Sequence, residues 1–138
     1  MSFQATNSAL TQAYLDLNIG LPTAYEGIDF EPPAAADWAA LSIIPAINAP
    51  TTLGKGGQDQ EDGILQIDFF TVFGKSTDAL LTYANTVQTG MVSGMSLLYD
   101  DTTVWISAVE RTNVRTDDGW LRITINVVYL SRFTRPTF

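Results

Sequence analysis

Residues Leu121-Arg122-Ile123-Thr124-Ile125-Asn126-Val127-Val128-Tyr129 decide the fold class of this chain. Apolar side chains alternate with Arg122, Thr124 and Asn126, and a period of two is typical of a β-strand with one buried face. The pair Asp118-Gly119 stands just before this stretch and tolerates the positive φ angles that tight hairpins require. The sequence therefore predicts a hairpin turn at residues 116–119 and an antiparallel meander in the last third of the chain.

Further strands are predicted on either side of the middle of the chain. One runs from Thr103 to about Thr112, with Trp105 and Val109 on one face and Val104, Ile106 and Ala108 on the other. Another covers residues 37–44 and is predicted to end at Pro45, because proline cannot donate a ladder hydrogen bond. A short extended piece is expected at residues 23–26.

Residues 64–73 form the most apolar predicted strand. Leu65, Ile67, Phe69 and Phe73 share one face, and Phe70 and Val72 make the other face partly apolar as well. This pattern is typical of a central strand that is covered on both sides. Asp68 lies in this strand, and we expect it to pair with Arg122 of a neighbouring strand rather than to act as a buried acid.

Helical periodicity occurs at residues 2–17 and again after Ser76-Thr77-Asp78, which is expected to cap a second helix ending near Gly90. The apolar stripe of the second helix is Leu80, Ala84, Val87 and Met91. The order of elements predicts a single α+β domain over residues 1–138, with a mostly antiparallel sheet packed by two helices on one face.

Two segments have no predicted place in the domain interior. Residues 46–62 contain Gly54, Gly56 and Gly57 followed by acidic residues, and we expect a long flexible loop there. Residues 132–138 are expected to form an extended C-terminal tail.

Composition excludes several classes of function. The net charge is −8, with 7 scattered basic residues, whereas nucleic-acid binding requires clustered cations. The chain has no cysteine and no histidine, which removes disulfides, thiolate and imidazole metal ligands and the commonest general base. No apolar run approaches the ~20 residues of a membrane span, and the N-terminus lacks signal-peptide features, so we expect no membrane partner and a soluble, cytosolic setting.

No motif indicates an enzyme. Gly74-Lys75-Ser76-Thr77 resembles the end of a phosphate-binding loop, but Phe69 occupies the position of the required first glycine. Gly54-Lys55-Gly56-Gly57 has no strand before it, and the acidic residues at positions 59, 61 and 62 miss the spacing of a calcium loop. We therefore predict no catalytic residue, no cofactor and no metal.

The succession of motifs resembles the small tail-terminator proteins of long-tailed bacteriophages, also described as tail completion proteins. The resemblance spans about residues 2–133 and is carried by 25–33 (YEGIDFEPP), 38–45 (WAALSIIP), 51–54 (TTLG), 63–70 (GILQIDFF) and 118–127 (DGWLRITINV). It implies a mixed sheet packed by helices and a structural protein in the virion. It further implies a ring, with six subunits in long-tailed phages, that caps the head-proximal end of the tail tube, stops tube polymerisation and provides the interface for head–tail joining. The implied partners are copies of the chain, the tail tube protein and a head completion or connector protein, while genomic DNA passes through the lumen without specific binding.

On this interpretation, three groups of residues are candidate contact sites. The loop residues Leu53, Gly54, Lys55, Gly56, Gly57 and Gln58 are expected at a subunit or tube interface. The acidic residues Asp59, Glu61 and Asp62 are expected to face the lumen and repel DNA. The C-terminal residues Arg132, Phe133, Arg135 and Phe138 are expected to form a further contact.

Three alternatives stay open at the level of sequence. The chain can be another head–tail connector, namely an adaptor or a stopper. It can be a small nucleotide-binding enzyme that uses residues 74–77. It can also be a peptide- or sugar-binding module in which Trp38, Trp105 and Trp120 form an exposed platform.

Overall fold

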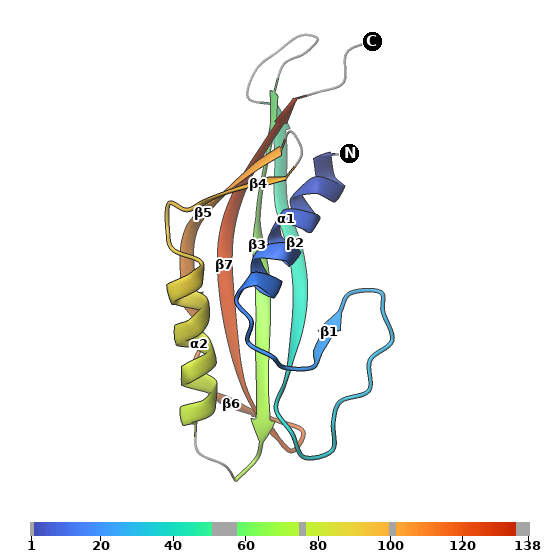
Figure 1. Ribbon diagram of the computed structural model, residues 1–138, viewed down its shortest axis with the longest axis vertical. Coiled ribbons are helices and arrows are strands. Elements are labelled where there is room, and N and C mark those ends of the chain that lie inside the picture. The colour runs from blue at the N-terminus through green and yellow to red at the C-terminus, as the bar shows by residue number, and fades with distance from the viewer. Residues whose placement is uncertain (1, 51–57, 75–76, 100–101, 135–138) are drawn as a thin grey trace.

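The computed structural model describes residues 2–50, 58–74, 77–99 and 102–134. The elements follow in the order α1 (Ser2–Asp16), β1 (Thr23–Tyr25), β2 (Trp38–Pro50), β3 (Gln58–Val72), α2 (Asp78–Gly90), β4 (Ser96–Tyr99), β5 (Thr102–Arg111), β6 (Arg115–Asp117) and β7 (Trp120–Thr134). They form a single α+β domain with a mostly antiparallel sheet and two helices, as the sequence predicts (Figure 1).

The sheet has seven strands in the order β1-β2-β3-β7-β5-β4, with β6 paired to β7. The pairing of β1 with β2 is parallel, and the other pairings are antiparallel. The long strands β3 and β7 lie side by side at the centre, where Ile67 is opposite Ile125 and Asp68 is opposite Thr124. The central position predicted for the strand at 64–73 is therefore confirmed.

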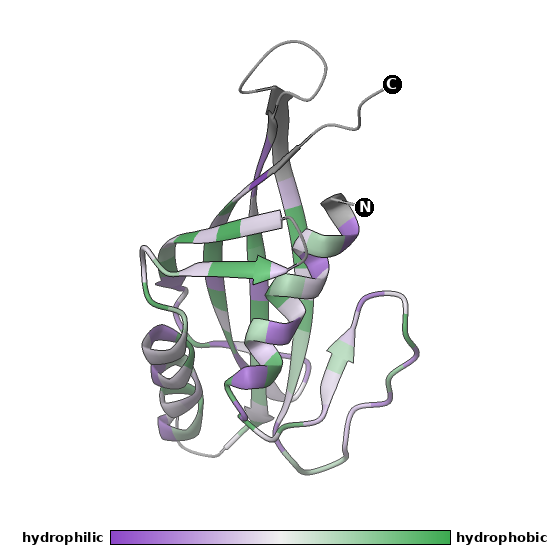
Figure 2. Ribbon diagram, turned by 45° about the horizontal axis from the view of Figure 1, so that its top comes forward, coloured by the Kyte–Doolittle hydropathy of each residue, from purple (hydrophilic) through white to green (hydrophobic). Residues whose placement is uncertain are grey.

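One face of the sheet carries the hydrophobic core. Leu65, Ile67 and Phe69 of β3 are fully buried there, next to Ile123, Ile125 and Val127 of β7. Leu10 of α1 and Leu80 of α2 join the same core cluster, so both helices cover this face. Figure 2 shows both helices alternating between hydrophobic and hydrophilic residues, as expected for helices with one packed side.

The predicted turns and helix ends agree with the backbone. Asp118 and Gly119 have φ angles of 48° and 83°, the left-handed conformation expected of a tight hairpin. Helix α1 ends before Asn18, which has a φ angle of 52°. Helix α2 begins at Asp78 and ends at Gly90. The Thr77 side chain makes no capping hydrogen bond, and Ser76 lies outside the described residues. No helix in the described part of the chain is long and apolar enough to cross a membrane.

The prediction of a loop over all of residues 46–62 was wrong at both ends. Strand β2 continues through Pro45 to Pro50, and β3 begins at Gln58, with Asn48 opposite Glu61 and Pro50 opposite Asp59. The register shifts between Pro45 and Ile47, and such a bulge lets a strand near the sheet edge continue past a proline. Residues 51–57 lie outside the described part of the chain.

Three further differences concern β5, β4 and the C-terminal end of β7. The register of β5 shifts between Ile106 and Ala108, so Val109 lies opposite Val127 and packs against the core instead of sharing a face with Trp105. The short edge strand β4 was not predicted. Residues 132–134 of the expected tail belong to β7, where Thr134 is opposite Gln58.

Candidate functional site: the helix-free face and the strand arm

The face of the sheet opposite the helices carries an aromatic cluster at one end. Trp38 of β2 and Phe70 of β3 are opposite each other in register and stack, with ring centroids 3.9 Å apart and planes at 6°. Trp120 meets Trp38 edge-on at 5.9 Å, and Phe30 lies 5.5 Å from Trp38. Such contacts stabilise a rigid apolar surface.

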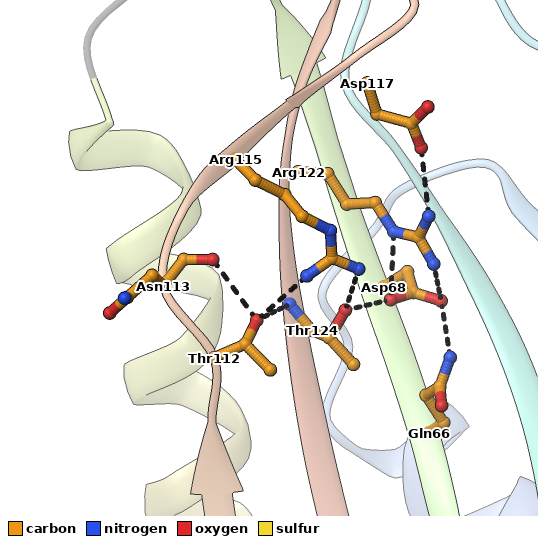
Figure 3. A network of polar contacts seen from close by, with 8 residues as sticks. All are labelled: Gln66, Asp68, Thr112, Asn113, Arg115, Asp117, Arg122 and Thr124. Atoms are coloured by element: carbon orange, nitrogen blue, oxygen red, sulfur yellow. Dashed lines mark hydrogen bonds and ion pairs between the residues drawn. The ribbon is translucent and has the colours of Figure 1, made fainter.

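An ion-pair network borders this cluster on the same face (Figure 3). The carboxylate of Asp68, 4% exposed, accepts hydrogen bonds from Nε of Arg122 at 3.3 Å and from Oγ1 of Thr124 at 2.5 Å. A second guanidinium nitrogen of Arg122 lies 3.1 Å from Oδ2 of Asp68, and the third lies 2.9 Å from Oδ2 of Asp117. The predicted pairing of Asp68 with Arg122 is confirmed.

The folded structure stabilises the charged form of Arg122. Burial lowers its pKa, but hydrogen bonds and charge from Asp68 and Asp117 outweigh that effect and raise the pKa. The guanidinium also lies over the Phe70 ring, 5.4 Å from its centroid. Arg122 therefore joins the ion-pair network to the aromatic cluster.

The network continues to the junction of β5, β6 and β7. Arg115 donates hydrogen bonds to Oγ1 of Thr124 at 3.1 Å and to Oγ1 of Thr112 at 3.3 Å. Gln66 donates a further hydrogen bond of 3.1 Å to Asp68. This arrangement joins three strands, β3, β6 and β7, to the residue that follows β5. Because Asp68 accepts several hydrogen bonds and forms an ion pair, its carboxylate is poorly placed to take a proton from a substrate.

A second polar contact fastens α2 to the sheet. Asp37, just before β2, accepts hydrogen bonds from Oγ1 of Thr71 at 2.7 Å and from the hydroxyl of Tyr83 at 2.5 Å. Burial and the Asp37 carboxylate raise the pKa of Tyr83 to about 12.

Among the described residues, no group of three or more acidic, cysteine or histidine side chains is placed to hold a metal ion.

The family profile described as phage tail terminator protein matches residues 4–129. The chain belongs to the phage tail terminator family. Members of this family are structural, non-enzymatic proteins of the virion tail.

Comparisons with solved structures bear on the fold alone, because the identities are low. One solved chain is 18% identical, with a TM-score of 0.79 over 96% of this chain and 97% of that chain. A chain from the virion of a native gene transfer agent particle is 16% identical, with a TM-score of 0.59 over 97% of this chain and 98% of that chain. No curated protein sequence matches the chain significantly.

Two segments that the sequence predicts to make contacts in a tail terminator lie side by side in the structure. Residues 58–62 of β3 run antiparallel to residues 130–134 of β7, with Asp59 opposite Phe133 and Gln60 opposite Arg132. With residues 46–50 of β2 they form an extension of the sheet, which we call the strand arm, beyond the N-terminal end of α1 (Figure 1). Arg132 is exposed, lies 5.9 Å from the centroid of Trp105, and donates a hydrogen bond of 3.4 Å to Gln60. Leu53–Gly57, Arg135 and Phe138 lie outside the described residues.

Glu61 corrects the expectation for the acidic group. It is 5% exposed, and its Oε1 accepts a hydrogen bond of 2.8 Å from the hydroxyl of Tyr129. Burial raises the pKa of Tyr129, and the charge of Glu61 raises it further. Glu61 therefore stabilises the base of the strand arm and does not face outward, whereas Asp62 is half-buried and accepts a hydrogen bond of 3.1 Å from Gln60.

The three tryptophans do not form one platform. Trp38 and Trp120 touch in the aromatic cluster, whereas Trp105 packs beneath Arg132 near the strand arm. All three are half-buried. Sequence reasoning missed the Tyr129–Glu61 and Tyr83–Asp37 contacts, because each joins residues more than forty positions apart that share no motif.

Proposed function

We propose that the chain assembles into a ring that caps the head-proximal end of the tail tube, stops tube polymerisation and presents a surface for head–tail joining. The match to the phage tail terminator family over residues 4–129 carries this proposal. The expected assembly is a hexamer through which genomic DNA passes without specific binding.

The two ends of the sheet support a ring. A closed ring needs two different contact surfaces on each subunit. At one edge of the sheet, β1 pairs with β2 only at Ala39–Leu41. Further along β2, the Ile43 amide donates a hydrogen bond of 2.7 Å to the Glu26 side chain, and Pro45 has no amide hydrogen. At the other end, β4 is a four-residue edge strand with Leu98 and Tyr99 exposed at 75% and 42%. Because the two edges of the sheet differ, one edge of a subunit can contact the other edge of the next subunit.

The strand arm supports a contact outside the subunit. Its distal part extends past the helices (Figure 1), whereas Glu61 and Ser131 at its base are buried in their own chain. We propose that the arm contacts the tail tube or a neighbouring subunit, and that Leu53–Gln58 and the C-terminal residues Arg132, Phe133, Arg135 and Phe138 take part in this contact. We further propose that Asp59 and Asp62 face the lumen, where negative charge keeps DNA from adhering.

Measuring the assembled mass of the purified chain, alone and with tail tubes, tests the ring. We expect a hexameric mass and binding at one end of each tube. A chain that stays monomeric alone and does not associate with tubes contradicts the proposal.

The lumen assignment has its own test. Changing Asp59→Asn and Asp62→Asn together is expected to slow or block DNA ejection from otherwise normal particles. Asp118→Asn is the matched control, because it removes one surface charge at a turn where asparagine is equally suited. Ejection at the normal rate with the double variant would remove these residues from the lumen.

A further inference from the structure

The two lateral sides of the subunit differ in charge. The segment between β1 and β2 carries Glu26, Asp29 and Glu31, and no Lys or Arg precedes Lys55 in the sequence. The opposite side carries Arg111 at the end of β5, with Arg115 close by in β6. Neither arginine forms an ion pair within the described residues, and Asp117, two positions after Arg115, pairs with Arg122. The segment between β1 and β2 is thus acidic without any cation, whereas the opposite side carries arginines beside the carboxylate of Glu110.

The acidic segment also presents a largely exposed apolar side chain. Ile28 is 66% exposed and is flanked by Gly27 and Asp29. A turn holds it in place, because the Ile28 amide donates to the carbonyl of Tyr25 at 3.3 Å and Gly27 adopts a φ angle of 75°. Figure 2 shows hydrophobic and hydrophilic residues alternating along this segment, which extends away from the sheet. Ile28 is therefore held at the surface by a defined backbone.

A groove suited to such a side chain lies on the other lateral side. It runs between α2 and the end of β5 and has a volume of about 150 Å³. Its lining is half apolar and half polar: Leu81, Ala84, Val109 and Ile125, with Asn85, Gln88, Glu110 and Arg111. Arg111 stands at the same groove. A space of about 150 Å³ is large enough for a group the size of benzene, so one isoleucine side chain fits against the apolar part of the lining.

The relative position of the two surfaces excludes an intramolecular contact. The segment between β1 and β2 projects on one side of the sheet, and α2 with the end of β5 lies on the other, at the same level of the long axis (Figure 1). A symmetric two-fold dimer made through either surface alone would bring like charges together. Contact between the two different surfaces of successive copies brings opposite charges together, and this is the geometry of rings.

We propose that Ile28 of one copy occupies the groove between α2 and β5 of the next copy, with Asp29 and Glu31 beside Arg111. This inference rests on the proposed function, because it names a subunit contact within the same ring. The hydrophobic side chain supplies the burial, and the charges set the direction of packing.

Two single variants, one on each surface, test this contact. Ile28→Asp replaces the apolar side chain of the segment by a charge and leaves the groove intact. Arg111→Glu reverses the charge at the groove and leaves the segment intact. Both residues are exposed, so both variants are expected to fold, which circular dichroism and urea unfolding verify. Each variant alone is expected to weaken self-association at least tenfold, measured as assembled mass against concentration with and without tail tubes. Val92→Asp, at a 54% exposed position outside the groove, is the matched control and should assemble like the wild type.

Mixing the two variants gives the decisive result. The intact segment of the Arg111→Glu chain can enter the intact groove of the Ile28→Asp chain, but the remaining two surfaces are both spoiled. We therefore expect an equimolar mixture to form dimers and to stop there, although each variant alone is monomeric.

The outcomes separate this inference from the ring itself. If the wild type assembles and both variants assemble equally well, this contact is wrong and the ring stands. If the wild type never associates with itself or with tubes, both the ring and this contact are wrong. Monomers in the mixture would also overturn the proposed pairing.

Discussion

The hydroxyl of Tyr129 donates a hydrogen bond of 2.8 Å to the carboxylate of Glu61, and both side chains are buried between the sheet and α1. Close by, the hydroxyls of Thr6 in α1 and Ser131 in β7 are 2.7 Å apart. These contacts mark where the helix-covered sheet passes into the strand arm. Burying a carboxylate is unfavourable unless it is hydrogen-bonded, so this pair stabilises the base of the arm.

Removing the Tyr129 hydroxyl is expected to destabilise the fold. Tyr129→Phe leaves the buried Glu61 without this donor, and the free energy of unfolding should fall by about 1–3 kcal/mol. Urea unfolding at neutral pH measures the change. Tyr99→Phe, at a position 42% exposed, should change stability by less than about 0.5 kcal/mol. Equal stability of Tyr129→Phe and the wild type would show that the hydrogen bond does not hold the arm.

Gly63 is expected to tolerate no side chain. A Cβ atom there would lie 2.6 Å from the Tyr129 hydroxyl and 2.7 Å from the Ile44 carbonyl oxygen, which belongs to the backbone. Gly63→Ala should therefore destabilise the protein by about 1–3 kcal/mol. Gly90→Ala is the comparison, because its Cβ would meet the end of the flexible Leu17 side chain at the end of a helix. The free energy of unfolding measured in urea should be clearly lower for Gly63→Ala than for Gly90→Ala. The reverse order would contradict the close packing of Tyr129 on Gly63.

The two carboxylates that bind Arg122 are expected to contribute unequally. Asp68 is 4% exposed and accepts bonds from three side chains, so Asp68→Asn should cost about 2–3 kcal/mol of unfolding free energy. The Asp117 side chain is 41% exposed, so Asp117→Asn should cost less than about 1 kcal/mol. Equal losses in thermal or urea unfolding would show that burial of the pair does not decide its strength.

Stability is expected to fall at alkaline pH. The pKa of Tyr83 rises from 10.0 to about 12 on folding, so the folded state favours the neutral phenol. The stabilisation is fully present below pH 10 and is lost as the pH rises through about 12. Urea unfolding at increasing pH should show a loss in the wild type that is smaller in Tyr83→Phe. Parallel curves for the two proteins would show that the Tyr83–Asp37 bond does not contribute.

Much of the fold could be predicted from local patterns. The alternation at residues 121–129, the Asp118-Gly119 turn and the helical stripe from Leu80 are local signals, and each element lies where its pattern indicated. The pairing of Asp68 with Arg122 could also be predicted, because both are charged residues on the partly apolar second face of adjacent strands.

The remaining features depend on contacts between distant parts of the chain. Proline, glycine and acidic residues at positions 45–62 favoured a loop, but residues 47–50 pair with residues 59–62, and residues 58–62 also pair with β7. A bulge after Pro45 permits the first pairing. The bulge in β5 reverses the face of Val109 without a marker in the sequence. Burial of Glu61 depends on Tyr129, 68 positions away, and on the absence of a side chain at Gly63. The groove between α2 and β5 likewise exists only once the sheet has formed.

The length of tails in particles that lack this protein tests the central claim most directly. If the chain terminates the tail tube, electron microscopy of such particles should show tails of uncontrolled length, and wild-type protein supplied in trans should restore a single length. Tails of normal length combined with heads that leak DNA would instead assign the chain to the stopper role and contradict termination.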